Sequence, residues 1–199
     1  YDVFTHISHV VENAPADPAL RWAALLHDVG KPQTFSVDDS GCGHFYGHAK
    51  ESAAIADAVL RCLKAPTRLR EDVVTLVELH MIRIEPTKKV VRRWLSRLGK
   101  EALDRLLVFM TADMSATAAG ISDDYISFDS IRSILAEIEA ENACLSLKDL
   151  AVNGHDLMAL GLAGPEIGRT MQRLLGLVLD EQIENTKDAL LRAAAEDLS

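Results

Sequence analysis

The sequence of 199 residues predicts an all-α protein. Apolar residues recur three and four positions apart along nearly the whole chain, which is the spacing of one face of a helix. Alternation of apolar and polar residues at a period of two, the pattern of a half-buried strand, is nearly absent. Asp and Thr stand where helices are expected to begin, and Gly or Pro stands where they are expected to end. A chain of this length holds two domains at most.

The composition is that of a globular protein without a membrane partner. No apolar run approaches the roughly 18 residues that a membrane span needs, and the N-terminus lacks a signal peptide, so a cytoplasmic protein is expected. The formal net charge of −9 argues against coating nucleic acid through bulk charge, so any RNA contact has to be local. Cys42, Cys62 and Cys144 are widely spaced and form no CxxC pair, which predicts reduced thiols with a packing role.

A helix is expected from Pro18 to Gly30. Asp17 is placed to cap its start, and Pro18 suits the first helical turn. Gly30 is a typical stop signal. Because His27 and Asp28 come shortly before this stop, the adjacent pair is expected at the end of a helix.

Two further helices carry one histidine each. The first runs from His48, at its start, to Pro66. The second follows Thr67, which can cap it, and its apolar stripe ends with a histidine. The members of this stripe are Leu69, Val73, Leu76 and His80. The side chain of His80 is therefore expected to face where the apolar residues face.

The rest of the chain predicts five more helical segments. They are a basic helix at 88–99, a helix at 100–120, an amphipathic helix at 128–142, a short helix at 155–160 and a long helix from Pro165. In the second of these, Asp113 falls in register with the apolar residues Leu103, Leu106 and Met110. Its side chain is expected to point inward.

Polar side chains on inner helix faces are the candidates for chemistry. Burying a carboxylate or an imidazole without a partner costs several kcal/mol. A divalent cation would compensate this cost, because imidazoles and carboxylates from several helices can converge on one ion. The residues concerned are His27, Asp28, His80 and Asp113.

Each of these residues has another interpretation when it is taken alone. A single histidine such as His80 is more often a hydrogen-bonded core residue than a ligand. Asp113 could equally cap a helix or pair with an arginine, and Asp28 could pair with Arg21. The adjacent pair His27 and Asp28 favours a site, because neighbours on a helix point roughly 100° apart and serve one site only near a helix end or inside a crevice.

The ordered set His6, His27-Asp28 and Asp113 resembles the H…HD…D signature of the HD phosphohydrolase superfamily. The resemblance implies an HD-domain helical bundle in which these four residues hold a divalent metal: Mn, Ni, Fe, Zn or Mg. The segment HDVGK is similar to the HDxGK form common there, which implies that Lys31 meets a substrate phosphate. His48 and His80 fall where many members carry two more histidines, which bind a second metal or contact the substrate.

A narrower resemblance covers nearly the whole chain. YDVFTH, WAALLHDVGKP, GHFYGHAKESA and SLKDLAVNGHDLMALGLAGPEIGRTMQRLLGLVL look like the downstream half of bacterial CCA-adding tRNA nucleotidyltransferases and poly(A) polymerase-like proteins. This implies an HD domain at 1–120, a connecting helix at 121–145 and a small C-terminal helical unit at 146–199. It also implies that tRNA or an RNA 3′ end, and nucleotide phosphoesters, are substrates.

The catalytic head of that family, with its paired D-x-D carboxylates, has no counterpart in this sequence. Nucleotide addition is therefore not expected from this chain alone. The chain opens at Tyr1 without a methionine, which indicates a fragment of a longer protein, and the resemblance implies an upstream nucleotidyltransferase domain in that parent protein.

Several polar residues keep two interpretations. His9 could share a helical face with His6, His44 is either a solvated loop residue or a substrate contact, and His155 is expected at the surface. A basic stripe lies on the helix at 88–99 and consists of Lys88, Lys89, Arg92, Arg93 and Arg97. A solvated face is the default for such a run, and the family resemblance adds RNA-phosphate contacts.

The expected activity is hydrolysis of a phosphomonoester or a 2′,3′-cyclic phosphodiester. Asp28 is expected to orient or deprotonate a water molecule, and Lys31 with His48 or His80 to stabilise the developing oxyanion. The alternative is a non-catalytic scaffold that helps a missing head to bind tRNA. Retention of every ligand position in the signature speaks against the scaffold, because unpaired ligands are costly to bury.

Overall fold

The computed structural model describes residues 2–116, 123–141 and 143–196 and confirms the all-α prediction. Two strands of two residues each are the β-structure in these ranges. None of the described helices combines the length and the apolar character that crossing a membrane requires.

The chain packs as two compact units whose limits differ from the expected boundaries. The first unit comprises Tyr1–Arg83 and Lys100–Phe128, and the second comprises Ile84–Gly99 and Asp129–Ser199. The basic helix therefore belongs to the second unit although it precedes residue 100. The boundary expected between residues 120 and 121 lies outside the described residues.

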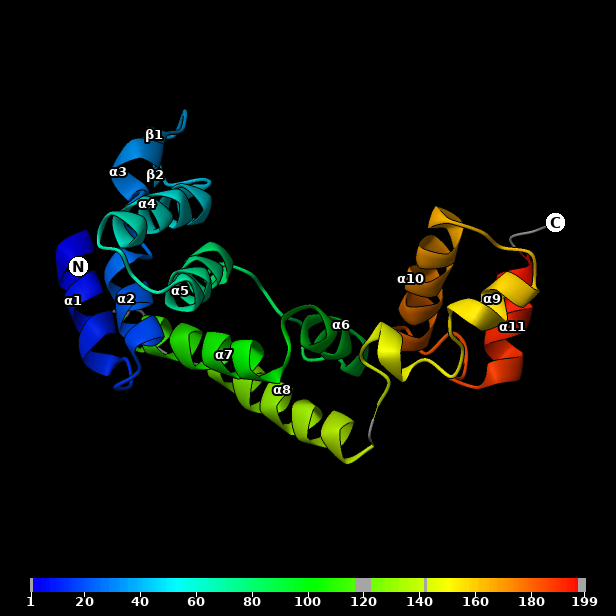
Figure 1. The fold of residues 1–199 in the computed structure, drawn as a ribbon. Helices are drawn as coiled ribbons and strands as arrows, with labels where there is room; N and C mark the ends of the chain where they lie inside the picture. The colour runs from blue at the N-terminus through cyan, green and yellow to red at the C-terminus, as the bar shows by residue number, and fades with distance from the viewer. Residues whose placement is uncertain (1, 117–122, 142, 197–199) are drawn as a thin grey trace. The chain divides into compact units, whose positions relative to one another are not determined.

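The first unit contains a bundle of helices with a short hairpin beside it (Figure 1). Its elements are α1 (Val3–Asn13), α2 (Pro18–Leu26), α3 (Lys31–Thr34), β1 (Ser36–Val37), β2 (Gly43–His44), α4 (His48–Cys62), α5 (Thr67–Leu79) and α7 (Lys100–Ser115). Helix α5 packs against α2, α4 and α7, and α1 packs against α2 and α7. The core between them includes Leu60, Val73, Leu103 and Phe109, all fully buried.

Helix α2 shows how local sequence places the His27–Asp28 pair. The Asp17 side chain caps the helix by accepting from the backbone N–H groups of Ala19 and Leu20 at 2.7 and 3.1 Å. The helix ends at Leu26, four residues before the predicted stop, and His27 is its C-cap. The pair thus lies in the turn between α2 and α3.

Gly30 allows this turn to approach α4 closely. A Cβ atom at residue 30 would lie 2.7 Å from the backbone nitrogen of Ser52 and 2.9 Å from the carbonyl oxygen of His48. The Gly30 N–H donates to Ser52 Oγ at 2.9 Å. The glycine therefore holds Asp28 against the helix that begins with His48.

The hairpin of β1 and β2 is a feature that the sequence did not predict. The strands pair antiparallel, with Ser36 opposite His44 and Val37 opposite Gly43. Strands of two residues are too short to show an alternating pattern.

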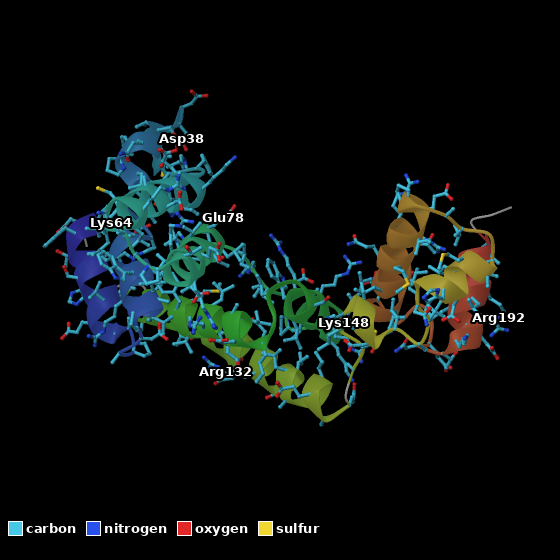
Figure 2. The ribbon with its side chains drawn as sticks, in the orientation of Figure 1. Asp38, Lys64, Glu78, Arg132, Lys148 and Arg192 are labelled. Atoms are coloured by element: carbon cyan, nitrogen blue, oxygen red, sulfur yellow. The ribbon has the colours of Figure 1, made fainter. Side chains whose placement is uncertain are left out.

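The second unit is a set of helices, and the last three of them share an apolar core (Figure 1). Its elements are α6 (Lys88–Leu98), the part of α8 (Asp123–Ala140) from Asp129 onward, a 3₁₀ helix (Leu147–Asp149), α9 (Gly154–Ala159), α10 (Pro165–Leu179) and α11 (Lys187–Ala195). The core includes Leu157, Leu174 and Leu190, which are fully buried. The start of α10 at Pro165 agrees with the prediction, and α11 was not predicted. Lys148 and Arg192 lie on this unit (Figure 2).

Candidate metal centre

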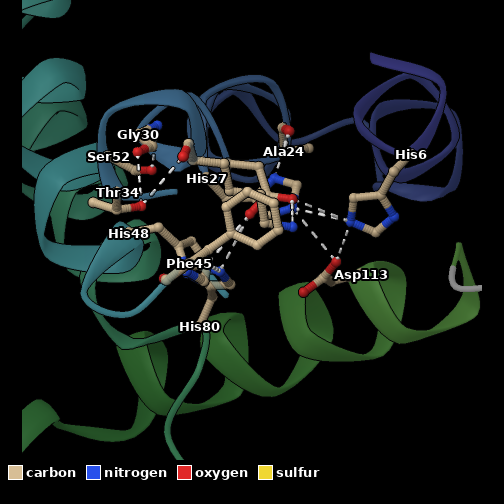
Figure 3. Close-up of polar contacts among 12 residues, drawn as sticks. His6, Ala24, His27, Gly30, Thr34, Phe45, His48, Ser52, His80 and Asp113 are labelled. Atoms are coloured by element: carbon tan, nitrogen blue, oxygen red, sulfur yellow. Dashed lines mark hydrogen bonds and ion pairs between the residues drawn. The ribbon is translucent and has the colours of Figure 1, made fainter. Parts of the chain in front are cut away.

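Three histidines of the first unit present the ring nitrogen Nε2 to the surroundings of Asp28, because the Nδ1 atom of each ring faces a backbone carbonyl. A carbonyl oxygen only accepts hydrogen bonds, so Nδ1 must carry the proton. In the neutral ring, Nε2 then offers a lone pair. The contacts are His27 Nδ1 to Ala24 O at 2.9 Å and His48 Nδ1 to Phe45 O at 2.8 Å (Figure 3). The third is His80 Nδ1 to Val77 O at 2.7 Å.

The first cluster joins His6 of α1, the His27–Asp28 pair and Asp113 of α7. Figure 3 shows His6, His27 and Asp113 turned toward one another. His6 Nε2 lies 3.2 Å from His27 Nε2 and 2.9 Å from Asp113 Oδ1. His27 Nε2 lies 3.5 Å from Asp113 Oδ1 and 3.4 Å from Asp28 Oδ2. The structure thus brings together all four residues predicted to bind the metal.

The second cluster uses the other oxygen of the same aspartate. Asp28 Oδ1 lies 3.3 Å from His48 Nε2 and 3.9 Å from His80 Nε2. The two imidazole nitrogens are 3.2 Å apart. Asp28, only 1% exposed, therefore stands between two groups of ligand atoms.

These separations fit ligands that share a metal ion. Metal–nitrogen bonds of about 2.1 Å place neighbouring ligand atoms roughly 3.0 to 3.4 Å apart in octahedral or tetrahedral geometry. Lone pairs that face each other at such distances repel, and a cation between them removes the repulsion. The donor set is nitrogen and oxygen, which suits transition-metal ions such as Mn, Fe, Ni and Zn. The residues present therefore fit a divalent metal.

The charges in the metal-free protein favour a cation at the first cluster. Burial by itself would lower the pKa of His27, but its hydrogen bonds to Asp113 and Asp28 outweigh burial and raise the pKa to about 9. Burial would raise the pKa of Asp28 and Asp113, yet His27 holds both well below the ordinary value. The potential that retains a proton on His27 also attracts a metal ion.

His80, in the second cluster, has the opposite preference for a proton. Burial lowers the pKa of His80 to about 4, and the charge of His27 adds to the effect. His80 is therefore neutral near pH 7, with a lone pair on Nε2.

Lys31 lies at the edge of the centre. Its Nζ is 2.6 Å from Asp28 Oδ2 and 5.6 Å from the centroid of the Phe45 ring, and the side chain is 22% exposed. The ammonium group is thus paired with the buried carboxylate while it remains accessible from solvent.

The other histidines considered from the sequence lie elsewhere. His9 is 3.8 Å from Glu12 on the surface of α1, and His155 is exposed. His44 is 2.7 Å from Asp38 in the hairpin.

Two residues of the centre were not predicted from the sequence, Ser52 and Phe109. Ser52 accepts a hydrogen bond from Gly30, and Phe109 lies edge-on against His27 and His80. Ser52 follows His48 by one helical turn, a spacing that could have indicated it.

Four members of the basic stripe of α6 are paired with carboxylates of its own unit, and Arg97 lies over the Trp94 ring at 5.1 Å. Lys88 lies 2.5 Å and Arg92 3.1 Å from Glu141, and Arg92 also lies 2.6 Å from Glu181. The remaining pairs are Arg93 with Asp180 at 2.7 Å and Lys89 with Asp180 at 3.2 Å. An RNA phosphate would have to compete with these carboxylates.

Fold and site define an all-α protein with a buried cluster of histidines and aspartates that fits a metal ion, and a separate helical unit. The chain belongs to the tRNA nucleotidyltransferase family, because residues 45–194 match the family model described as tRNA nucleotidyltransferase domain 2. That match contains His48, His80 and Asp113 and begins after His6, His27 and Asp28.

Known proteins similar to this chain agree with the family. It is 34% identical over 184 residues to the A-adding tRNA nucleotidyltransferase of Deinococcus radiodurans, covering 87% of this chain and 42% of the relative. It is 33% identical over 187 residues to the CC-adding tRNA nucleotidyltransferase of Thermus thermophilus, covering 92% of this chain and 41% of the relative. A multifunctional CCA protein of Aromatoleum aromaticum is 42% identical over 84 residues, 41% of this chain and 20% of the relative. The chain thus spans about two fifths of the length of the first two relatives.

Proposed function

We propose that the first unit is a metal-dependent phosphohydrolase that acts on phosphomonoesters or 2′,3′-cyclic phosphodiesters, as its resemblance to the HD superfamily implies. The observation that supports this most is the position of Asp28. Its two oxygens face two groups of imidazole nitrogens at 3.3 to 3.9 Å. Such a carboxylate can bridge two divalent ions.

His6, His27, Asp28 and Asp113 would hold one ion, and Asp28, His48 and His80 a second. A divalent cation in such a site supplies a Lewis acid for phosphoryl oxygens and lowers the pKa of water toward neutrality. The sequence left two roles open for His48 and His80. With Nδ1–H committed to a carbonyl, a neutral ring has no proton on Nε2 to donate to an oxyanion, which favours the ligand role.

Lys31 would bind the substrate phosphate. Its ammonium group is paired with Asp28 in the metal-free protein at 2.6 Å. When Asp28 is engaged by cations, the pairing with Lys31 weakens because like charges repel. The flexible, partly exposed side chain is then available for a phosphoryl oxygen.

The family gives the proposed substrates. Because the relatives are an A-adding and a CC-adding tRNA nucleotidyltransferase, we propose tRNA or another RNA 3′ end as the partner. A nucleotidyltransferase head in the parent protein would perform the addition, and the centre described above would remove phosphate or open a cyclic phosphate at the same kind of RNA end.

A tRNA-binding scaffold without catalysis is the second candidate. It is favoured by the names of the relatives, which describe nucleotide addition and no hydrolysis. Turnover of bis(p-nitrophenyl) phosphate and a 2′,3′-cyclic nucleotide, with and without added Mn²⁺ or Ni²⁺, separates the two. The phosphohydrolase requires metal-dependent turnover by the purified chain. Absence of turnover in a metal-loaded protein supports the scaffold.

A further inference from the structure

The hairpin of the first unit carries a second group of metal-ligand side chains. Asp38 follows β1, Cys42 precedes β2 and His44 lies in β2. One ligand atom of each residue lies within 4.8 Å of the other two. We propose that these three residues form a binding site for a thiophilic divalent ion such as Zn²⁺, separate from the centre around Asp28. We call it the hairpin site.

The carboxylate of Asp38 is held in position before any ion binds. Its Oδ1 accepts from the Ser40 N–H at 2.9 Å, from the Ser40 hydroxyl at 2.6 Å and from the Cys42 N–H at 2.9 Å. Its Oδ2 is therefore turned toward His44 Nε2, at 2.7 Å. Two ligand atoms already meet, and Figure 2 shows Asp38 at this hairpin.

The imidazole of His44 is also held by its neighbours. Its ring stacks on the ring of Tyr46, with centroids 4.9 Å apart and planes 14° from parallel. Phe35 packs on β2 so closely that a Cβ atom at residue 43 would lie 2.8 Å from its ring. Ligands that are ordered beforehand lose less conformational entropy when they bind an ion.

Cys42 determines which ions fit. A thiolate, an imidazole and a carboxylate are all zinc ligands, whereas Mg²⁺ and Ca²⁺ prefer oxygen alone. The centre around Asp28 offers only nitrogen and oxygen from histidine and aspartate. The two sites therefore differ in kind, and a sulfur ligand distinguishes them.

The geometry requires only a small movement. Bonds of about 2.3 Å to sulfur and 2.0 Å to nitrogen place tetrahedral ligand atoms roughly 3.5 Å apart. Cys42 is exposed, contrary to the predicted packing role of the cysteines, so its side chain can rotate toward His44. Binding releases the thiol proton and replaces the hydrogen bond between Asp38 and His44. Three protein ligands leave the fourth position to water.

An ion in the hairpin site would order the segment that leads to the other centre. The hairpin continues directly into Phe45, whose carbonyl oxygen accepts from His48 Nδ1 at 2.8 Å. An ion bound in the hairpin site would thus order the backbone that orients His48. It would add no ligand to the centre around Asp28.

Titration of the reduced, metal-free chain with Co²⁺ tests the proposal. A cobalt–thiolate charge-transfer band in the near ultraviolet reports sulfur ligation, which the histidine and aspartate centre cannot produce. We expect the band in the parent chain and its loss in Cys42→Ser. His44→Ala should weaken Co²⁺ binding measured from this band by at least about tenfold. Zn²⁺ should displace the bound Co²⁺ and so remove the band, and excess Mg²⁺ should leave the band unchanged.

Cys62→Ser and Cys144→Ser are the matched controls, because neither thiol belongs to a ligand group in the described ranges 2–116, 123–141 and 143–196. Both variants should keep the band. A parent chain without the band, a band that persists in Cys42→Ser, or unchanged affinity in His44→Ala overturns the proposal. These outcomes are independent of phosphoester turnover, so failure of the hairpin site and failure of the phosphohydrolase are distinguishable.

Discussion

The Nε2 atoms of His48 and His80 lie 3.2 Å apart while the Nδ1 atom of each ring faces a backbone carbonyl. If both rings are neutral, two lone pairs face each other beside an oxygen of Asp28. This arrangement is unfavourable in a buried site unless a proton or a cation lies among the three atoms. The low pKa of His80, about 4, argues against a proton on His80 Nε2, and a cation among the three atoms would remove the repulsion.

Replacing both histidines by alanine should therefore remove one bound metal ion and leave the other. We expect His48→Ala/His80→Ala to lower the metal content by about one ion per chain, because His6, His27 and Asp113 keep the first cluster. Elemental analysis after gel filtration in Mn²⁺ measures this content. His9→Ala is the matched control, since its ring lies beside Glu12 outside both clusters. Equal metal content in the double variant and the parent contradicts the second ion.

Metal affinity should rise with pH between about 6.5 and 9. The pKa of His27 in the metal-free protein is about 9, so at pH 7 its ring is protonated and must release that proton to become a ligand. In this range the affinity of the first cluster should increase by up to about tenfold per pH unit. Calorimetric titration in buffers of different ionisation enthalpy should detect about one proton released at pH 7. Affinity that is independent of pH over this range contradicts the assignment.

His27 and His80 should together give the metal-free protein a pH of maximum stability. The pKa of His27 is raised on folding, so its contribution is full below pH 6.5 and is lost as the pH rises to about 9. The pKa of His80 is lowered, so its contribution is full above pH 6.5 and is lost as the pH falls to about 4. The melting temperature in chelator should therefore be highest near pH 6.5, and a steady rise from pH 6.5 to 9 would contradict this.

Much of the centre could be predicted because its residues stand at helix signals. Asp17 and Pro18 fix the start of α2, and Gly30 indicates its end, which places the His27–Asp28 pair at a turn. Asp113 was predicted to point inward from its register with apolar residues, and it lies 2.9 Å from His6. Periodicity identified these faces although it carries no information on distance.

Other features depend on contacts between distant segments. The assignment of α6 to the second unit rests on packing against α10 and on ion pairs with Glu141 and Asp180, which no local pattern reports. The orientation of the two oxygens of Asp28 toward different clusters likewise depends on the three-dimensional packing. The hairpin escaped prediction because its strands are two residues long.

Gly30→Ala should weaken both the fold and the metal centre. The new Cβ atom would meet backbone atoms of Ser52 and His48 at 2.7 and 2.9 Å, so α4 must shift away from the turn that carries Asp28. We expect a loss of about 1 to 3 kcal/mol in the free energy of unfolding and weaker metal binding. Gly168→Ala in α10 is the matched control, because apart from its chain neighbours and the backbone of its own helix, no atom of the described residues lies within 4 Å of its Cβ position. Denaturant unfolding measures the stability of both variants. Equal stability of Gly30→Ala and the parent contradicts the close approach of residue 30 to α4.

Asp180→Asn tests the proposed RNA contacts of α6. This carboxylate pairs with Lys89 and Arg93, so its removal frees two cations for RNA phosphates. We expect tighter binding of tRNA at low salt and a steeper loss of affinity as salt increases. The slope of this salt dependence should increase by the equivalent of about one to two phosphate contacts. Asp188→Asn on α11 removes the same charge from an exposed position and is the control. Identical salt dependence in the two variants excludes Lys89 and Arg93 from the RNA interface.

Asp28→Asn separates catalysis from a structural role. The substitution keeps the volume of the side chain but replaces a carboxylate that faces both clusters with a neutral amide. Metal binding and activation of water should both suffer. Against bis(p-nitrophenyl) phosphate and a 2′,3′-cyclic nucleotide with Mn²⁺ or Ni²⁺, turnover should fall by at least about 100-fold, equivalent to about 2.7 kcal/mol of barrier.

A purely structural Asp28 gives a different pattern. If the carboxylate serves only as the partner of Lys31 at 2.6 Å, its replacement should cost roughly 1 kcal/mol of stability and change no activity. Asp104→Asn is the matched control, because this aspartate pairs with Lys100 on the surface of α7 and should leave turnover unchanged. Initial rates and melting temperatures of the three proteins decide the matter. A parent chain that is inactive with every metal, together with an Asp28→Asn variant that differs only in melting temperature, would leave the tRNA-binding scaffold as the function of this unit.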